Sequence, residues 1–284
     1  MSDEILVYAT LERADIVRRL LAAACGTTGV AARLELYGSG SLFQRLGPRH
    51  APPLPDIVVW NGPFAAHSAA QAGLLQAYQP ARAADQVARD SQWRWIALDY
   101  SVFAVTGLPP VSSIDDLASV PLLALADPER SEAGTMLLLA TLDRARQVQG
   151  DVEQAWAWWR RRVQTGIRTF EDEASARAAV GGGGGPSHAI GFGDAPGLIG
   201  LAPMPNAVGL ASNARNLDAA RRVLDWMSGE QAASLLSLSP WQTGTGSSAL
   251  QTALRGPPTL DLDWTTQQYS QARRRWAQSG FGPT

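Results

Sequence analysis

The sequence predicts an α/β fold of two lobes, each a mainly parallel sheet flanked by helices, with a ligand cleft between the lobes. Three observations predict it. Apolar stretches alternate with amphipathic helical stretches over residues 4–78, the pattern of strands joined by covering helices. A second series of the same kind begins at residue 120. Two extended apolar stretches, 96–107 and 202–212, separate the series, and we interpret them as strands that cross between the lobes.

The first series consists of three strands, each followed by a helix. We expect strands at 4–10, 32–38 and 56–62 and helices at 11–25, 38–46 and 63–78. In the first helix Ile16, Val17, Leu20 and Leu21 share one apolar face. Ligands of such sheets bind beyond the carboxyl ends of the strands. The candidate binding residues there are Tyr8, Thr10, Ser39, Gly40, Ser41, Trp60 and Asn61. For Tyr8 and Trp60, contact with a ligand and packing in the lobe's core remain equal alternatives.

The second series has the same character. We expect strands at 120–126, 166–170 and 187–196 and helices starting at Thr135, at 152–163 and at 171–180. After the second crossing stretch, residues 217–237 predict one long amphipathic helix capped by Asn216. The glycine run 181–185 matches neither a phosphate-binding loop nor a dinucleotide fingerprint, so we interpret it as a flexible surface connection.

Composition excludes several classes of protein. The chain is 45% hydrophobic and 18% charged, with a formal charge of −2, so it is globular and has no basic stripe for nucleic acid. Every basic residue other than histidine is arginine, which removes Schiff-base lysine chemistry. The single Cys25 allows neither a disulfide framework nor a zinc cluster. No stretch is long and apolar enough to span a bilayer, and the N-terminus shows no secretory leader.

Several segments taken together carry a family resemblance. They are VYATLERADIVRRLLAA, YGSGSLFQRL, PDIVVWNGPFAAHSAAQAGLLQAYQP, ADPERSEAGTMLLLATL, AIGFGDAP, PNAVGLASNARNLDAARRVLDWMSGEQ and LDLDWTTQQYSQARRRWAQ. In this order they resemble the extracellular solute-binding proteins of ABC importers, nearest to the type 2 group of ferric-iron, phosphonate and sugar-phosphate binders. The resemblance implies lobes that close over a solute, delivery to a membrane permease, and a periplasmic or lipid-anchored location.

The resemblance and the crossing stretches together define the expected domain boundaries. We expect residues 1–102 in the first lobe and 103–204 in the second. Residues 205–284 are expected to return to the first lobe, with the C-terminal helix packing across both.

The stretch 126–146 raises a choice between a helix cap and an anion site. Hydroxyl residues before a helix accept hydrogen bonds from its first N–H groups, and the same N–H groups hold anions. In the family pattern this position faces the cleft, so the resemblance implies that Ser131, Ala133, Gly134 and Thr135 bind an oxyanion opposite the GSGS at 38–41. We therefore favour binding over capping.

The alternative ligand is ferric iron or a ferric complex that carries its own carboxylates. Ferric members of the group use adjacent tyrosines, and no two tyrosines are adjacent here. Phe192 and Asp194 stand where the pair is expected, and we include Asp194 among the binding residues. His50, His67 and His188 have no metal-binding spacing, so we interpret them as surface or helix-edge residues. We expect no metal or cofactor.

An enzyme and a ligand-sensing regulator are the remaining alternatives. No nucleophile with a base, paired carboxylates or cofactor fingerprint stands out, and Glu12 or Asp127 alone defines no reaction. A regulator would begin with a DNA-binding segment, whereas residues 4–10 already predict a strand. The sequence thus predicts a monomeric, non-enzymatic binder of a small anionic solute, namely a phosphonate, phosphate ester or carboxylate, with the permease as its protein partner.

Overall fold

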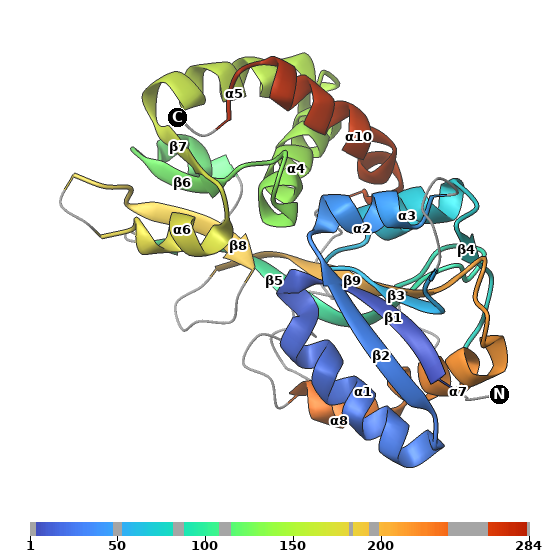
Figure 1. The fold of residues 1–284 in the computed structure, drawn as a ribbon. Helices are drawn as coiled ribbons and strands as arrows, with labels where there is room; N and C mark the ends of the chain where they lie inside the picture. The colour runs from blue at the N-terminus through green and yellow to red at the C-terminus, as the bar shows by residue number, and fades with distance from the viewer. Residues whose placement is uncertain are drawn as a thin grey trace. The chain divides into compact units, whose positions relative to one another are not determined.

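The chain divides into two compact units (Figure 1). The computed structural model describes residues 4–47, 53–81, 88–107, 115–181, 184–192, 199–237 and 261–282. Unit 1 is Met1–Ser101 with Met204–Ser248, and unit 2 is Val102–Pro203 with Ala249–Thr284. Two of the three boundaries fall inside β5 (Ile96–Gly107) and β9 (Ile199–Ala211), the two stretches interpreted as crossing strands. The third, between Ser248 and Ala249, lies outside the described residues.

Unit 1 is a sheet with helices on both faces. Its strands β1 (Glu4–Thr10), β2 (Ala31–Tyr37) and β3 (Ile57–Val59) are parallel in the order β2-β1-β3, β9 lies antiparallel beside β3, and the short β4 (Leu75–Gln76) pairs with β9. The helices of one face are α1 (Ala14–Thr28), α7 (Leu217–Met227) and α8 (Glu230–Ser237); those of the other are α2 (Ser39–Arg45) and α3 (Phe64–Gln71).

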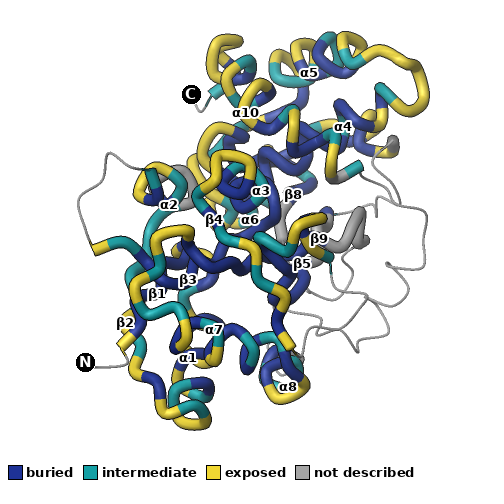
Figure 2. The backbone as a smooth tube through the Cα atoms, turned by 90° about the vertical axis from the view of Figure 1, so that its right-hand side faces the viewer, coloured by how far each residue is buried: buried dark blue, intermediate teal, exposed yellow. Residues whose placement is uncertain are grey.

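The alternation of side chains along β1 explains this layering. Ile5 and Val7 pack with α1, α7 and α8, whereas Leu6 and Tyr8 pack with α2 and α3, and all four are buried (Figure 2). Each such side chain contributes about 1.5–3 kcal/mol by leaving water. Helix α1 is preceded by a short 3-10 turn, η1 (Leu11–Arg13). Its C-terminus is capped by Gly29, whose φ of 70° is the left-handed conformation that glycine adopts most easily.

Unit 2 is also a sheet covered by helices. Strands β6 (Leu123–Ala126), β7 (Ile167–Phe170) and β8 (His188–Phe192) are parallel in the order β8-β6-β7, and β5 pairs antiparallel with β8. Its helices are η2 (Asp115–Ser119), α4 (Glu132–Gln149), α5 (Glu153–Thr165), α6 (Glu173–Ala178) and α10 (Leu262–Gln278). The predicted α/β fold class is confirmed.

The C-terminal helix belongs to unit 2, which differs from the expected return of 205–284 to the first lobe. Helix α10 packs on α4, and Trp276 stacks edge-on against Trp159 of α5 at 5.2 Å between ring centroids. Arg146 of α4 also pairs with Asp261, which caps α10, at 2.8 Å. These contacts join side chains that are distant in sequence, so a local sequence pattern could not predict them.

Three further expectations were wrong in their details. The predicted helix 217–237 is broken at 228–229 into α7 and α8, and the Asn216 side chain donates to the Glu4 carbonyl instead of capping α7. The helix expected at 63–78 ends at Gln71, and the chain continues into β4. The helix expected to start at Thr135 begins at Glu132.

His188 is a buried strand residue instead of a surface one. It is 1% exposed, and its Nδ1 lies 2.8 Å from the Ser187 hydroxyl. The opposing residue in β5 is Gly107, where a Cβ would lie 2.6 Å from the histidine ring, so the missing side chain provides the room. His50 and Asp194 lie outside the described residues, as do 182–183 of the glycine run.

Among the described residues, no helix has both the length and the apolar character that crossing a membrane requires.

Candidate functional site

The carboxyl ends of β1 and β3 bring Thr10, Trp60 and Asn61 together in unit 1. We call these three residues the unit 1 edge. Ala9 pairs with Val59 in the parallel β1–β3 ladder, so Thr10 and Trp60 follow next to each other. The side chains of both are fully buried, and Asn61 is 6% exposed. Three of the predicted binding residues therefore lie at one place.

Two polar atoms of the unit 1 edge lack a hydrogen-bond partner. They are the Thr10 hydroxyl and the Trp60 indole N–H, which are buried and make no hydrogen bond of normal geometry among the described residues; the Nε1 of Trp95, before β5, is in the same state. The Glu12 carboxylate nevertheless lies close enough to the Thr10 hydroxyl to interact with it. A buried donor without a partner costs free energy, and such groups in native proteins are usually satisfied by water or a ligand. Thr10 and Trp60 thus offer adjacent donors to an oxygen acceptor.

Asn206 of β9 holds the turn that follows β3. It is fully buried, its amide donates to the Ser101 hydroxyl at 2.9 Å, and its side-chain oxygen accepts from the Gly62 N–H at 3.1 Å. These bonds link the β3–α3 turn to both β5 and β9. Sequence reasoning missed Asn206 and Ser101, although an asparagine inside the apolar stretch 202–212 was an available signal.

A buried ion pair lies just after β1. Arg13 of η1 donates to Asp99 of β5, and the side chains of both are at most 4% exposed. The guanidinium charge is thereby balanced inside the unit. The neighbouring Glu12 interacts with the Thr10 hydroxyl, and burial of its carboxyl group raises its pKa. The unit 1 edge consequently presents neutral donors beside one carboxyl group.

Tyr8 belongs to the core beneath α2. Its hydroxyl donates to the Pro53 carbonyl at 2.8 Å, and its ring meets Tyr37 edge-on at 4.8 Å. Burial, and next the Glu35 carboxylate that accepts the Tyr37 hydroxyl, raise the pKa of Tyr37. Tyr37 therefore remains a neutral phenol at ordinary pH, and the hydroxyl of Tyr8 is engaged with the backbone.

The predicted residues Ser39, Gly40 and Ser41 form the first turn of α2, directly after β2. The helix begins after Gly38, whose carbonyl accepts the Leu42 N–H at 3.0 Å. This turn has only the short seven-residue α2 behind it, so its dipole is weak.

In unit 2, the segment Ser131–Thr135, which we call the α4 opening, is the N-cap and first turn of α4 and follows the loop after β6. The Ser131 hydroxyl accepts the Gly134 N–H at 3.4 Å, and the Thr135 hydroxyl lies 2.6 Å from the Pro128 carbonyl, to which it donates. Ala133 is fully buried. A Cβ on Gly134 would lie 2.0 Å from the Ala126 carbonyl oxygen, so glycine allows the helix to cross the loop closely. These contacts are those of a helix cap.

Helix α10 secures the same connection through two buried carboxylates. Asp127 accepts the Trp276 indole N–H at 2.9 Å, and Glu132 accepts the Tyr269 hydroxyl at 2.9 Å. Burial, and next the charge of Glu132, raise the pKa of Tyr269. An anion at the α4 opening would therefore meet two carboxylates that already occupy the positive end of the helix.

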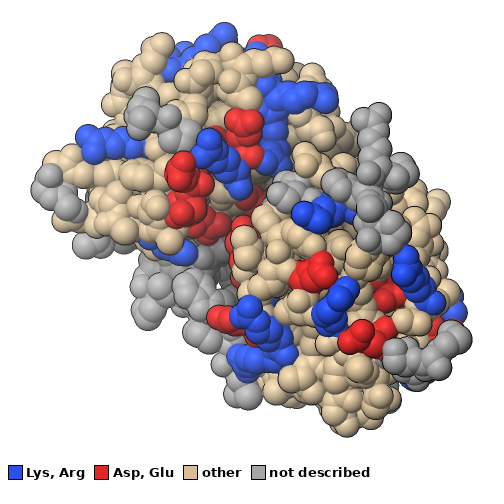
Figure 3. Space-filling model, viewed as in Figure 1, with Lys and Arg blue, Asp and Glu red and all other residues tan. Residues whose placement is uncertain are grey.

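Charged groups elsewhere form local pairs. In Figure 3, arginine and acidic side chains lie beside each other with broad uncharged areas between them, which agrees with the near-neutral formal charge of −2. In the part of the chain that the structure describes, no three His, Cys, Asp or Glu side chains are placed to hold a metal ion. Asp194 is outside that part.

The arrangement of the strands and crossing segments defines a class of fold: that of the type 2 periplasmic binding proteins. A ferric binding protein from Campylobacter jejuni superposes with a TM-score of 0.78 at 13% identity, covering 97% of this chain and 99% of its own. Iron-bound HitA from Pseudomonas aeruginosa gives 0.76 at 16% identity, covering 96% and 99%.

A third structure of this class is the periplasmic binding protein AfuA from Actinobacillus pleuropneumoniae with bound fructose-6-phosphate. Its TM-score is 0.70 at 17% identity, and 97% of each chain is covered. At these identities the likeness establishes the fold, and it confirms the predicted resemblance at that level. No known family model matches the sequence, and no curated protein matches it.

Proposed function

We propose that this chain is the solute-binding component of an ABC importer and that it holds a small oxygen-rich solute at the unit 1 edge. The observation that carries the proposal is a pair of buried donors that make no hydrogen bond of normal geometry, Trp60 Nε1 and Thr10 Oγ1, the second with the Glu12 carboxylate nearby. One acceptor oxygen for each would remove the cost of leaving them unsatisfied. Hydroxyl, indole and amide groups such as those of the unit 1 edge bind a solute through hydrogen bonds and do not react with it.

The solute that we favour is a ferric ion carried by its own carboxylate chelator. Two of the similar structures named above are described as ferric or iron-bound binding proteins. Fe(III) prefers anionic oxygen ligands, and the described residues offer no cluster of three metal-binding side chains. A chelated ion brings those oxygens itself, and its outer carboxylates are acceptors for Thr10 and Trp60.

A sugar phosphate is the second candidate, because AfuA has the same fold and was captured with fructose-6-phosphate. A phosphate ester also presents acceptor oxygens. For either solute, we extend the proposal to Asn61 and to the first turn of α2. The α4 opening of unit 2 stays a separate proposal for anion binding, and it is the weaker one, since the hydroxyls of Ser131 and Thr135 already bond to their own backbone.

The remaining parts of the proposal follow from the fold class. The protein would work outside the cytoplasm, either in the periplasm or held by a lipid anchor, and would deliver its solute to a membrane permease. It would act as a monomer and would release the solute chemically unchanged.

Calorimetric titration tests the proposal with three probes: ferric citrate, citrate alone and fructose 6-phosphate. We expect saturable one-site binding of ferric citrate and much weaker binding of citrate. Tight binding of the sugar phosphate alone would select the second candidate. If none of the three probes binds, and mass spectrometry of protein purified under native conditions finds no co-purified small molecule, the importer function is contradicted.

Absorption spectroscopy tests how the iron is held. Tyrosinate ligands give Fe(III) an intense visible charge-transfer colour. Because no two tyrosines are adjacent in the sequence, protein loaded with ferric citrate and desalted should show no purple-red band. A stable purple-red protein with stoichiometric iron would show that phenolates of this chain bind the metal.

A further inference from the structure

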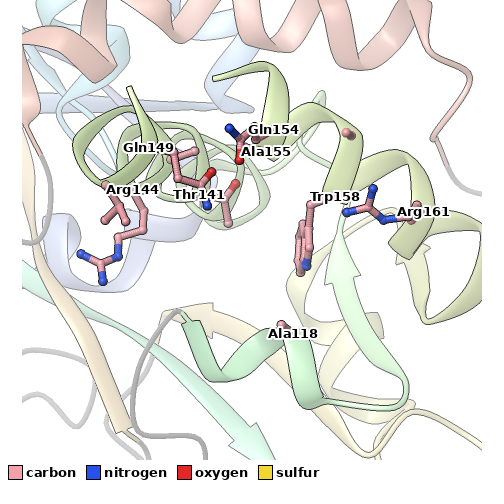
Figure 4. A pocket seen from close by; sticks show the side chains of 11 residues that line it. Ala118, Thr141, Arg144, Gln149, Gln154, Ala155, Trp158 and Arg161 are labelled. Carbon is pink, nitrogen blue, oxygen red and sulfur yellow. The ribbon is translucent and has the colours of Figure 1, made fainter. Parts of the chain in front are cut away.

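Unit 2 contains a cavity of about 590 Å³ beside the C-terminal half of α4, at the end of that helix opposite the α4 opening. It is bordered by the second half of α4, from Thr141 to Gln149, by α5, and by Ala118 of η2 (Figure 4). Because α4 starts beside the carboxyl end of β6, its last turns lie toward the opposite end of that strand. The cavity is therefore separate from the strand ends of the proposed solute site.

The lining of this cavity combines one aromatic face with positive charge. Among the described residues, the charged side chains that line the cavity are Arg144 and Arg161, and the other polar side chains of the lining include Gln149 and Gln154. Figure 4 shows Trp158 and Arg161 on the α5 side, with Arg144 on the α4 side. A cavity of this size is within the usual range for small-molecule sites. On a protein of formal charge −2, a lining whose charged groups are arginines favours an anion.

Trp158 is held in place by its neighbours. Its ring meets that of Trp159 edge-on at 4.9 Å, and Trp159 is fully buried with its indole N–H donating to Thr141 at 2.7 Å. This bond ties α5 to α4, the two walls of the cavity. Arg162 lies 5.9 Å from the Trp158 ring centroid. A ring fixed in this way needs little ordering when a ligand stacks on it.

We propose that this cavity binds a small planar anion of the aromatic carboxylate class. Its ring lies against Trp158 and near the exposed Val148, and its carboxylate pairs with the Arg161 guanidinium. Planar guanidinium and carboxylate groups form two parallel hydrogen bonds, which fixes the orientation of the ligand. Stacking adds affinity beyond the area buried. The proposal is independent of the importer function, because it uses none of the residues of the strand ends.

The test is a titration of the full chain with 2-naphthoate. Two matched probes remove one property each: 2-naphthamide lacks the charge, and cyclohexanecarboxylate lacks the planar ring. We expect 2-naphthoate to bind at least about tenfold more tightly than either, since a hydrogen bond to a charged group is worth about a factor of ten or more. Equal binding of 2-naphthoate and 2-naphthamide would overturn the proposal, as would no binding of 2-naphthoate.

Variants then locate the site. Arg161→Gln should weaken 2-naphthoate about tenfold or more, whereas Arg160→Gln, an exposed neighbour on α5 outside the lining, should leave it unchanged. Trp158→Leu should also weaken binding of 2-naphthoate. If this variant has a sharply lowered melting temperature, the test is made by comparing Arg161→Gln with Arg160→Gln. Equal affinities of the Arg161 and Arg160 variants would overturn the proposal. Binding of ferric citrate should be the same in both variants, which separates this site from the importer function.

Discussion

The strand ends of the two units look alike in sequence and differ in structure. In unit 1, Thr10 and Trp60 end their strands as buried donors that make no hydrogen bond of normal geometry, with the Glu12 carboxylate beside Thr10. In unit 2, Ser131 and Thr135 follow their strand with hydroxyls bonded to the adjacent backbone, and α10 donates to one oxygen of each of the carboxylates Asp127 and Glu132. The difference shows that a small hydroxyl residue at a strand end indicates a ligand only when the surrounding chain leaves it unpartnered.

The largest expected effect comes from filling the space at Gly134. In the Gly134→Ala variant the new Cβ would meet the Ala126 carbonyl at 2.0 Å, so α4 must shift from its loop. We expect a loss of about 3 kcal/mol or more in the free energy of unfolding, measured with urea. Gly26→Ala in α1, with open space around it, is the control and should be neutral or slightly stabilising. Equal stabilities of the two variants would show that α4 does not cross its loop this closely.

The second-largest effect concerns the hydrogen bond that α10 makes to the first turn of α4. Tyr269→Phe removes the hydroxyl that donates to Glu132 at 2.9 Å and that also accepts from Arg273. A buried hydrogen bond to a charged group contributes about 1.5–3 kcal/mol, so the free energy of unfolding should fall by about that amount. Thermal and urea unfolding measure it. A variant as stable as the parent would mean that α10 stabilises unit 2 by packing alone. The engaged polar groups of α10 would then no longer distinguish unit 2 from unit 1.

The third prediction compares one hydroxyl from each unit by stability. Ser131→Ala removes the cap of α4 and should cost about 1 kcal/mol. Thr10→Val replaces a buried hydroxyl without a partner by a methyl group, so stability should stay the same or rise by about 1 kcal/mol. A clear loss of stability in Thr10→Val would reveal an internal partner for that hydroxyl and would remove the main argument for the unit 1 edge.

The smallest expected effect is a change in the free energy of unfolding at alkaline pH. Burial, together with the hydrogen bond to Asp225, raises the pKa of Tyr78 to about 12. The unfolded phenol titrates near about 10, so its contribution to stability is complete below that pH and is lost as the pH rises toward about 12. Tyr78→Phe should flatten this part of the stability profile, recorded as urea midpoints. Parallel profiles for parent and variant would contradict the assignment to Tyr78.

The layers of the fold could be predicted because they rest on local periodicity. The alternation in residues 4–10 and the apolar face of Ile16, Val17 and Leu20 are visible in the sequence, and burial in the structure follows both. The breaks were harder: α7 and α8 form one continuous amphipathic pattern, and only the placement of the chain around 228–229 separates them.

The candidate site was partly predictable. Thr10 and Trp60 meet because parallel strands end at the same edge, which the strand–helix repeat already implies. Whether a hydroxyl is engaged depends on groups that no local pattern identifies. Tyr269 reaches Glu132 across 137 positions of sequence, and Asn206 reaches Ser101 across 105. The distant partner of Asn206 explains why it was overlooked, whereas the Ser131 and Thr135 hydroxyls are engaged by local backbone groups, and anion binding at the α4 opening stays a prediction.

The central claim is that the solute is held by the partnerless donors of unit 1. It is tested most directly by calorimetric titration of ferric citrate, or of fructose 6-phosphate if that is the probe that binds, into the parent, Thr10→Val and Ser131→Ala. We predict that Thr10→Val weakens binding by about tenfold or more, because one hydrogen bond to an anionic oxygen is lost. Ser131→Ala should keep its affinity within about threefold, since its hydroxyl caps α4. Unchanged affinity in Thr10→Val together with a tenfold loss in Ser131→Ala would contradict the account.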